Sequence, residues 1–201
     1  MAPEFLFDFG SPNAYLAHRV IPDIEARTGV RFTYTPILLG GLFKLTGNQA
    51  PMLAFANIPN KLAYDMLELR RFVARHHIAF AMNPHFPVNT LALMRGAVAA
   101  ELDGVLPAYA EAGFHFMWEA PRKMDDPEVL AGALREAGLD ADRLLARAKD
   151  DDVKTRLLAS TEAAAKRGAF GSPTFFVGTE MFFGKDRLRD VEDEIAKQKA
   201  A

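Results

Sequence analysis

The stretch EFLFDFGSPNAYLA, residues 4–17, contains the signals of a strand, a tight turn and the start of a helix. Phenylalanine occupies every second position within residues 4–9, which is the period of a β-strand and places Leu6 and Asp8 on the opposite face. The glycine that follows ends the strand. The Ser-Pro pair after it is typical of a helix N-cap followed by the first helical residue. We therefore predict a strand that leads directly into a helix.

The segment after this strand completes a strand–helix–strand unit. The helix extends to about Thr28, and Gly29 is placed to act as its C-cap. Residues 31–38, RFTYTPIL, are predicted to form the second strand. Two strands joined by a crossover helix lie parallel, and the crossover is right-handed.

The C-terminal part of the chain carries a different unit, a hairpin followed by a helix. Residues 174–178 and 181–183 are predicted to be short aromatic strands, and the sequence Gly-Thr-Glu between them indicates a tight turn. Asp186 is the predicted N-cap of a final amphipathic helix.

The middle of the chain is mostly helical in pattern. Residues 40–60, which hold several glycines and prolines, are predicted to form a long loop, and such loops are often functional. The helices expected after this loop cover residues 61–76, 88–103, 106–119, 127–137, 141–149 and 152–167.

The order of these elements predicts an α/β fold, with a β-α-β unit, a long helical insertion and a β-β-α unit. This is a thioredoxin-like core with a large all-helical domain inserted between its two halves. We expect residues 1–40 and 168–201 to form the core and residues 41–167 to form the inserted domain.

The composition argues against several kinds of site. The 201 residues include no cysteine, so the chain supplies no disulfide, thiolate metal ligand or cysteine nucleophile. The five histidines show no metal-ligand spacing, and we expect no metal site. A formal net charge of −2 gives no reason to expect nucleic acid as a partner, and no apolar run approaches the ~18 residues of a membrane span. We expect a cytoplasmic protein without a membrane partner.

The tetrapeptide Phe-Gly-Ser-Pro occurs twice, at residues 9–12 and 170–173. In a thioredoxin-type core, the start of the first helix lies beside the loop that precedes the third strand. We therefore expect the two copies to meet, with Pro173 in the place where such a loop holds a cis-proline.

Three segments carry a resemblance to a known family: FDFGSPNAYLA at 7–17, GAFGSPTFFVG at 168–178 and MFFGKDRL at 181–188. With these segments, and with NIPNKLAY at 57–64, the chain resembles the kappa-class glutathione transferases, and within them the bacterial 2-hydroxychromene-2-carboxylate isomerases. The broader relatives are thiol:disulfide oxidoreductases with Cys-Pro-x-Cys at the start of the first helix. Here that position reads SPNA, at 11–14, so the chain cannot perform dithiol redox chemistry itself.

The resemblance and the physics of a helix start together imply reduced glutathione as the cofactor. A helix N-terminus offers unpaired N–H groups and about half a positive charge, which stabilises a thiolate. Because the chain has no thiol, glutathione would supply it, and Ser11 would act as the catalytic residue by donating a hydrogen bond to that thiolate. The backbone of Ser172 would pair with the cysteinyl peptide unit. The resemblance places the remaining glutathione contacts at Phe183, Gly184, Lys185 and Asp186.

On the substrate side, the resemblance implies a pocket for a small aromatic carboxylate, lined by Lys44, Asn57, Ile58 and Phe86. Lys44 would pair with the carboxylate, a charge-assisted contact worth ~1.5–3 kcal/mol. The implied activity is the glutathione-dependent cis–trans isomerisation between 2-hydroxychromene-2-carboxylate and trans-o-hydroxybenzylidenepyruvate in aromatic hydrocarbon degradation. The resemblance also implies a homodimer.

Other interpretations of these residues stay open. The same site would serve a kappa-type transferase that conjugates glutathione to electrophiles, or a non-enzymatic thioredoxin-fold module that binds extended peptides beside Pro173. Ser11 can be a plain N-cap and Asp186 a plain helix cap. Lys44 can be a solvated surface lysine.

Overall fold

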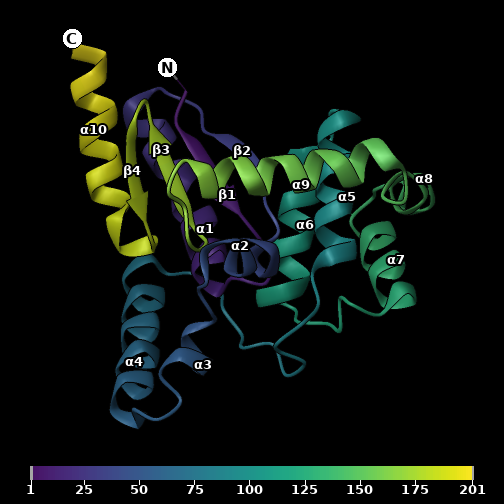
Figure 1. The fold of residues 1–201 in the computed structure, drawn as a ribbon, viewed down its shortest axis with the longest axis horizontal. Helices are drawn as coiled ribbons and strands as arrows, with labels where there is room; N and C mark the ends of the chain where they lie inside the picture. Colours follow the sequence, from purple (N-terminus) through teal and green to yellow (C-terminus); the bar gives the residue numbers. More distant parts are fainter. Residues whose placement is uncertain (1, 201) are drawn as a thin grey trace.

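The computed structural model describes residues 2–200, which are built around one four-stranded sheet (Figure 1). Strand β1 is parallel to β2 and antiparallel to β3, and β3 pairs antiparallel with β4. The strand order is therefore β2-β1-β3-β4, which is the predicted thioredoxin-like α/β arrangement. The strands are β1 (Glu4–Phe7), β2 (Thr33–Pro36), β3 (Thr174–Val177) and β4 (Glu180–Phe183).

One face of the sheet packs on helix α1 (Pro12–Thr28) and helix α10 (Leu188–Ala200). Phe5 and Phe7 belong to the same buried cluster as apolar residues of both helices. The predicted alternation of side chains along β1 is therefore confirmed on this face. Helix α1 ends as predicted at Gly29, which adopts the left-handed conformation with a φ of 69°.

The opposite face of the sheet is covered by helix α2 (Leu39–Thr46) and helix α9 (Asp151–Lys166). Leu6 of β1 is buried there in a second cluster with Leu42 of α2 and Ala164 of α9. The sheet is thus the middle layer of three.

The segment 40–60, predicted to be a loop, contains most of α2 and the short helix α3 (Pro51–Ala54). The loop prediction is wrong because contacts distant in sequence override the weak helix propensity of glycine. Leu42 is fully buried against the sheet. The Asp8 carboxylate accepts the N–H of Leu39, the first residue of α2, at 2.7 Å. The sequence of residues 40–60 alone reveals neither the sheet that buries Leu42 nor the Asp8 carboxylate that binds Leu39.

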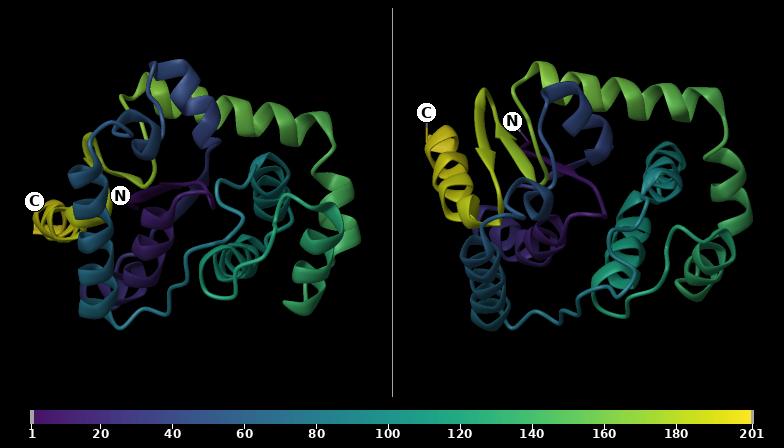
Figure 2. Two further views of the ribbon diagram at one scale, coloured as in Figure 1. Left: turned by 90° about the horizontal axis from the view of Figure 1, so that it is seen from below. Right: turned by 60° about the horizontal axis from the view of Figure 1, so that its bottom comes forward.

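The remaining helices lie close to their predicted positions. Figure 2 shows that α9 runs from the sheet to the group formed by α5, α6, α7 and α8. The bounds are α4 (Pro59–His76), α5 (Leu91–Leu102), α6 (Leu106–Trp118), α7 (Pro127–Glu136) and α8 (Ala141–Arg147).

Helix α5 begins at Leu91 rather than at residue 88. The Asn89 Oδ1 accepts the N–H of Leu91 at 3.1 Å. A short polar side chain that bonds the backbone two residues on competes with the helix and favours a turn, which explains the later start.

The sheet takes its strands from both of the predicted core segments. Helix α4, which lies in the predicted insertion, nevertheless packs on α1, and its Phe72 is buried in the same cluster as Phe5 and Phe7. The division of the chain at residues 40 and 168 stays a prediction. Within residues 2–200, no helix has both the length and the apolar character needed to cross a bilayer.

Close packing of α5 on α6 gives a first testable prediction. A Cβ placed on Gly96 would overlap the hydroxyl of Tyr109, whereas a Cβ on Gly132 of α7 would meet no atom within 4 Å. We expect Gly96→Ala to lower the free energy of unfolding by about 1–3 kcal/mol, because the added methyl group would overpack the core. The control Gly132→Ala should raise it by about 0.5–1 kcal/mol through helix propensity. Urea unfolding of both variants measures the difference, and equal effects would contradict the packing described.

Candidate active site

Helix α1 begins at a capped turn that follows strand β1. Ser11 is the N-cap, with extended backbone (φ −96°, ψ 112°), and its Oγ accepts the N–H of Ala14 at 3.1 Å. The same hydroxyl donates to the backbone carbonyl of Ser172 at 2.7 Å. Ser11 is 5% exposed. Its hydroxyl therefore caps α1 and also joins the helix start to a loop far away in sequence.

Ser172 lies in the loop before β3, and its peptide bond to Pro173 is cis. Its Oγ accepts the N–H of Asp8 at 3.2 Å and donates to the carbonyl of Leu6 at 3.4 Å. Together with the contact to Ser11, these bonds bring the two Phe-Gly-Ser-Pro copies side by side, as expected from the sequence.

The end of the hairpin lies against this loop. The N–H of Gly184 donates to the carbonyl of Pro173 at 2.9 Å. The ring centroids of Phe183 and Phe170 are 4.5 Å apart. A Cβ on Gly171 would lie 2.6 Å from the Phe183 ring, so the absence of a side chain there lets the ring approach the loop. Phe183 and Gly184 therefore share one surface with the two serines.

Several backbone N–H groups at this surface have no hydrogen-bond acceptor among residues 2–200. They include that of Asn13 in the first turn of α1 and that of Ser172. Free N–H groups at a helix start favour an anion. An unpaired N–H on an extended segment favours pairing with another peptide unit. The surface can therefore receive a peptide that carries a negative charge near Ser11.

Asp186 does not cap α10, and this corrects the sequence prediction. It lies in a short 3-10 turn (Lys185–Arg187), and α10 begins at Leu188. The cap position before the turn belongs to Gly184, which has a φ of 93° and no side chain that could accept a hydrogen bond. The Asp186 carboxylate instead accepts from the Nζ of Lys185 at 2.7 Å. The side chain of Asp186 is 71% exposed and can still meet a ligand.

The side chain of Lys185 is buried, with 5% of it exposed. Its Nζ lies 4.9 Å from the ring centroid of Phe72 in α4. A hollow of about 310 Å³ between α1, α4 and α10 is lined by Lys185 but not by Ser11 or Ser172. The Lys185 ammonium therefore lies between helices and pairs with Asp186, which lines the same hollow.

Lys44, Asn57 and Ile58, expected on the substrate side, are all exposed. Lys44 lies in α2 and forms no ion pair within the described part of the chain. Asn57 and Ile58 lie between α3 and α4. No hydrogen bond joins any of the three to Ser11 within residues 2–200, so the structure alone does not bring them into one site.

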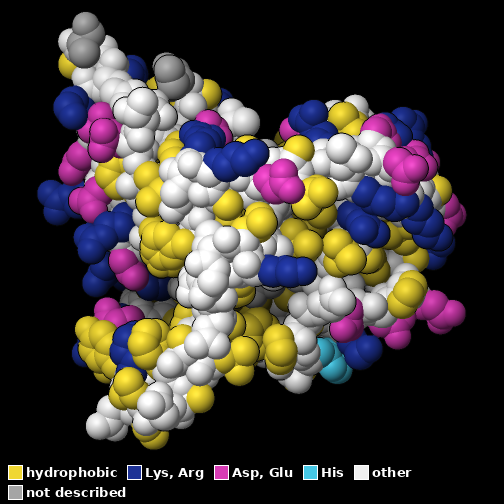
Figure 3. Space-filling view, in the orientation of Figure 1, with side chains coloured by type: hydrophobic (Ala, Val, Ile, Leu, Met, Phe, Trp, Pro, Cys, Tyr) yellow, Lys and Arg dark blue, Asp and Glu magenta, His cyan; other side chains and the backbone are white. Residues whose placement is uncertain are grey.

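The segment that carries these residues is apolar on its outside. Figure 3 shows hydrophobic side chains gathered at the lower left of the molecule, where Figure 1 places α3 and α4. A substrate bound there would meet hydrocarbon beside α2 and its lysine. The large apolar side chains exposed on α2, α3 and α4 are Leu45, Met52, Leu53, Tyr64 and Met66, with Ile58 before α4.

Phe86 is connected to the serine turn through Trp118. The ring centroids of Phe86 and Trp118 are 5.7 Å apart. The indole N–H of Trp118 donates to the carbonyl of Phe9 at 2.8 Å, two residues before Ser11. Phe86 therefore contacts the tryptophan that is hydrogen-bonded to the turn before Ser11.

Asp8 is the site residue that the sequence analysis missed. It was assigned only to the second face of a strand, but β1 ends at Phe7 and Asp8 is fully buried. Its carboxylate accepts the N–H of Gly10 at 2.8 Å and the N–H of Leu39 at 2.7 Å. A carboxylate between two phenylalanines, directly after a strand of a three-layer fold, is the signal that could have revealed it.

Burial raises the pKa of Asp8, because the charged form is desolvated there. Hydrogen bonds from Leu39, Gly10 and Thr90 act in the opposite direction and lower the pKa of the same carboxyl group. Burial is the larger effect. Because Asp8 accepts the N–H of Gly10, the protonation of Asp8 affects the turn that precedes Ser11.

Comparisons with known proteins match this geometry over nearly the whole chain. The model of the DSBA-like thioredoxin domain matches residues 4–196. A 2-hydroxychromene-2-carboxylate isomerase from Sphingobium xenophagum is 31% identical over 193 residues, which is 94% of this chain and 95% of that protein. Human glutathione S-transferase kappa 1 is 27% identical over 203 residues, 92% of this chain and 86% of the transferase. A solved 2-hydroxychromene-2-carboxylate isomerase superposes with a TM-score of 0.85 at 26% identity, covering 98% and 96% of the two chains.

The raised pKa of Asp8 predicts a pH-dependent contribution to stability. For a carboxyl group whose pKa is higher in the folded state, the stabilisation is present below the unfolded pKa and is lost as the pH rises through the folded pKa. In Asp8→Asn an NH₂ group faces a backbone N–H. We therefore expect the free energy of unfolding to fall by about 1–3 kcal/mol at acidic pH. The difference in free energy of unfolding between wild type and Asp8→Asn should become smaller as the pH rises, because wild type loses stability.

Chemical unfolding at a series of pH values measures this difference. Asp23→Asn, which changes an exposed residue on α1, is the matched control and should show a small difference at every pH. If the difference in free energy of unfolding between wild type and Asp8→Asn grew with rising pH, the raised pKa of Asp8 would be contradicted.

Proposed function

We infer the function of this chain from one premise: it belongs to the DSBA-like thioredoxin domain family. Its curated relatives include isomerases and transferases, which supports an enzymatic role. We propose that it is a glutathione-dependent cis–trans isomerase that interconverts 2-hydroxychromene-2-carboxylate and trans-o-hydroxybenzylidenepyruvate. The surface around Ser11 binds reduced glutathione as a cofactor that is not consumed.

The observation that carries the proposal is the Ser11 hydroxyl, buried at the helix start in a chain without cysteine. In the present structure its proton goes to the carbonyl of Ser172. In the glutathione complex the same proton turns toward the thiolate, which also receives the free N–H of Asn13. These donors and the positive end of α1 stabilise the thiolate over the thiol.

The remainder of glutathione extends along the loop and the hairpin end. The free N–H and the carbonyl of Ser172 pair with the cysteinyl unit in antiparallel fashion. The exposed carboxylate of Asp186 receives the γ-glutamyl ammonium, and the N–H groups of the Lys185–Asp186 turn receive its carboxylate. Phe183 and Gly184 form the wall between these two subsites.

The reaction requires reversible addition of the thiolate to the open, conjugated form of the substrate. The sulfur lone pair forms a C–S bond, the C=C bond becomes single, and its electrons move to the ketone oxygen as an enolate. Rotation about the single bond and reversal of the electron flow then break the C–S bond and give the trans alkene. Donors aimed at the enolate and the thiolate lower the barrier.

Lys44 is the proposed partner of the substrate carboxylate, and Asn57, Ile58 and Phe86 line the aromatic part of the pocket. Two observations support this assignment: Lys44 is exposed and has no ion-pair partner in the described chain, and the surface of α3 and α4 is apolar. Assembly as a homodimer and a place in the cytoplasm, in the breakdown of aromatic hydrocarbons, complete the proposal.

Two other functions use the same surface. A kappa-type transferase would keep the glutathione contacts and conjugate the thiolate to an electrophile, which the similarity to human glutathione S-transferase kappa 1 supports. A non-enzymatic module would use the Ser172 N–H for an extended peptide and would show no preference for a free thiol.

Calorimetric titration with reduced glutathione and with S-methylglutathione tests the thiolate site. We expect wild type to prefer the free thiol, and we expect Ser11→Ala to lose that preference and about 10- to 100-fold in kcat/KM, the value of a charge-assisted hydrogen bond. Losing the N-cap costs about 1 kcal/mol, so the variant should remain folded. No binding at millimolar glutathione would exclude both enzyme functions and leave the peptide-binding module.

The isomerase assay with Lys44→Ala tests the substrate side. Removing a charge-assisted contact should raise KM for hydroxychromene carboxylate about tenfold or more, with less effect on a neutral electrophile. Lys149→Ala, at another exposed lysine, is the matched control. Glutathione conjugation without isomerisation would identify the transferase instead.

A further inference from the structure

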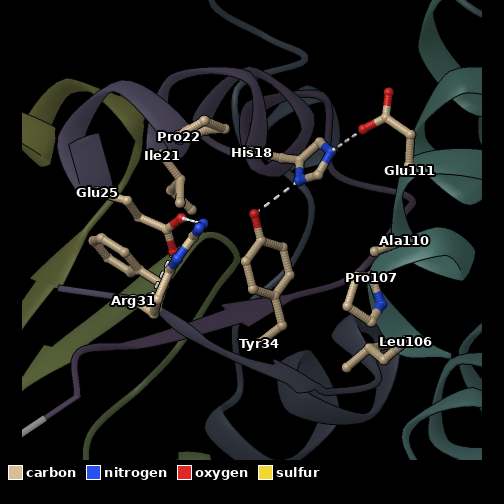
Figure 4. A pocket seen from close by; sticks show the side chains of 11 residues that line it. His18, Ile21, Pro22, Glu25, Arg31, Tyr34, Leu106, Pro107, Ala110 and Glu111 are labelled. Carbon is tan, nitrogen blue, oxygen red and sulfur yellow. Dashed lines mark hydrogen bonds and ion pairs between the residues drawn. The ribbon is translucent and has the colours of Figure 1, made fainter. Parts of the chain in front are cut away.

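A second hollow lies on the flank of α1, between α1, β2 and α6. Its volume is about 430 Å³, within the range of small-molecule sites. None of the proposed glutathione or substrate contacts lines it. Figure 4 shows His18 between Tyr34 and Glu111, with Glu25 and Arg31 at the other end of the hollow. The proposed reaction uses none of these five side chains.

The imidazole of His18 joins the three walls of the hollow. Its Nε2 lies 3.0 Å from Glu111 Oε2, and its Nδ1 lies 2.8 Å from the Tyr34 hydroxyl. Because a carboxylate only accepts, Nε2 carries the hydrogen in this pair, and Nδ1 of the neutral ring accepts from Tyr34. Both ring nitrogens are therefore occupied, and the free lone pairs belong to the oxygens of Tyr34 and Glu111.

The protonation of the two partners agrees with this arrangement. The hydrogen bond from His18 lowers the pKa of Glu111, so that this carboxyl group is ionised at neutral pH. Burial raises the pKa of Tyr34, so that its hydroxyl keeps its proton. The hollow is thus lined by one carboxylate and one phenol oxygen that can each accept a further hydrogen bond.

Pro22 alters the backbone hydrogen bonding of the same wall. It lies inside α1 and lines the hollow. A proline has no N–H, so the carbonyl of His18, four residues earlier, lacks the donor that a helix normally provides. The end of the hollow near His18 therefore offers acceptors from two side chains, and the helix beside it has one backbone hydrogen bond fewer.

Two arginines lie in or beside the hollow, and each already forms an ion pair. Arg31, 89% exposed, pairs with Glu25 at 2.6 Å, and Glu25 also accepts the N–H of Phe32 at 2.8 Å. Arg19, which lies outside the hollow, pairs with the other oxygen of Glu111 at 2.9 Å. The lining residues alone carry two carboxylates and one guanidinium, which leaves an excess of negative charge.

The rest of the lining is hydrocarbon. Ile21 and Phe32 are buried on one side, and Leu106 and Ala110 are buried on the other. The ring of Tyr34 forms part of the floor (Figure 4). An aromatic ring fits between such walls, and a cation beside the tyrosine ring is also attracted to its face.

We propose that this hollow is a second binding site, which takes a small organic cation with an aromatic ring, such as an aralkyl ammonium ion. The ring lies between Ile21 and Leu106. The ammonium donates to Glu111 and to the Tyr34 oxygen. This site is independent of glutathione and of the proposed isomerisation.

Titration of the full chain with benzylammonium tests the proposal. Benzyl alcohol and benzoate are the matched neutral and anionic probes, because they keep the ring and change the charge. We expect benzylammonium to bind and to shift the ¹⁵N resonances of the His18 ring, and we expect benzyl alcohol to bind at least about tenfold more weakly. Equal affinity for the three probes, or the absence of binding at millimolar concentration, would overturn the proposal.

Substitutions then separate the contributions of the individual contacts. Glu111→Gln should weaken benzylammonium binding about tenfold or more, and Tyr34→Phe should weaken it about two- to tenfold. Arg19→Gln should strengthen it, because Arg19 competes for Glu111. Glu136→Gln, at an exposed glutamate of α7 paired with Arg122 of the preceding loop, is the matched control and should leave benzylammonium binding unchanged.

Comparing the single variants Glu111→Gln and Arg19→Gln separates direct contact with the ligand from a structural effect. Both substitutions remove the same ion pair between α1 and α6, so a loss of packing would weaken binding in both variants. Opposite changes in affinity support the site, whereas parallel weakening overturns it.

Discussion

The buried carboxylate of Asp8 is the interaction on which the rest of the structure depends. It accepts the N–H of Gly10 in the turn before Ser11 and the N–H of Leu39 at the start of α2. The N-cap of α2 is Leu38, which has no polar side chain, so Asp8 performs the capping role from another part of the chain. A buried carboxylate needs such donors, and the two backbone segments need such an acceptor. One side chain thus fixes the entry to α1 and the helix that covers the second face of the sheet.

The backbone of the same residue connects the two halves of the core. Its N–H donates to Ser172 Oγ, and its carbonyl accepts the N–H of Ser11 at 3.0 Å. Ser11 and Ser172 are then joined by their own hydrogen bond. The Ser11 oxygen of the proposed thiolate site is consequently held in place before any ligand arrives, and only its proton has to turn. Fixed donors are the condition under which electrostatic stabilisation is most effective. In the proposed function, glutathione supplies the thiol that the chain does not possess.

Much of this arrangement could be predicted from short sequence patterns. The alternating phenylalanines of residues 4–9 predict β1, and the Ser-Pro pair at 11–12 and Gly29 predict the ends of α1. These patterns work because a period or a cap is a property of a few neighbouring residues. The repeated Phe-Gly-Ser-Pro also predicts the meeting of Ser11 with Ser172, but only once the order of the elements has indicated the fold.

Tertiary contacts decided what those patterns could not. Helix α2 forms in a glycine-containing stretch because Asp8, 31 residues before Leu39, accepts its first N–H. His18 meets Glu111 across 93 residues of sequence, and no local pattern connects them. The sequence by itself determined the strands, helix α1 and the serines at their junction, since these depend on local periodicity and capping. Only the tertiary structure decided which polar groups are buried and what they face, because burial depends on segments that the fold alone brings together.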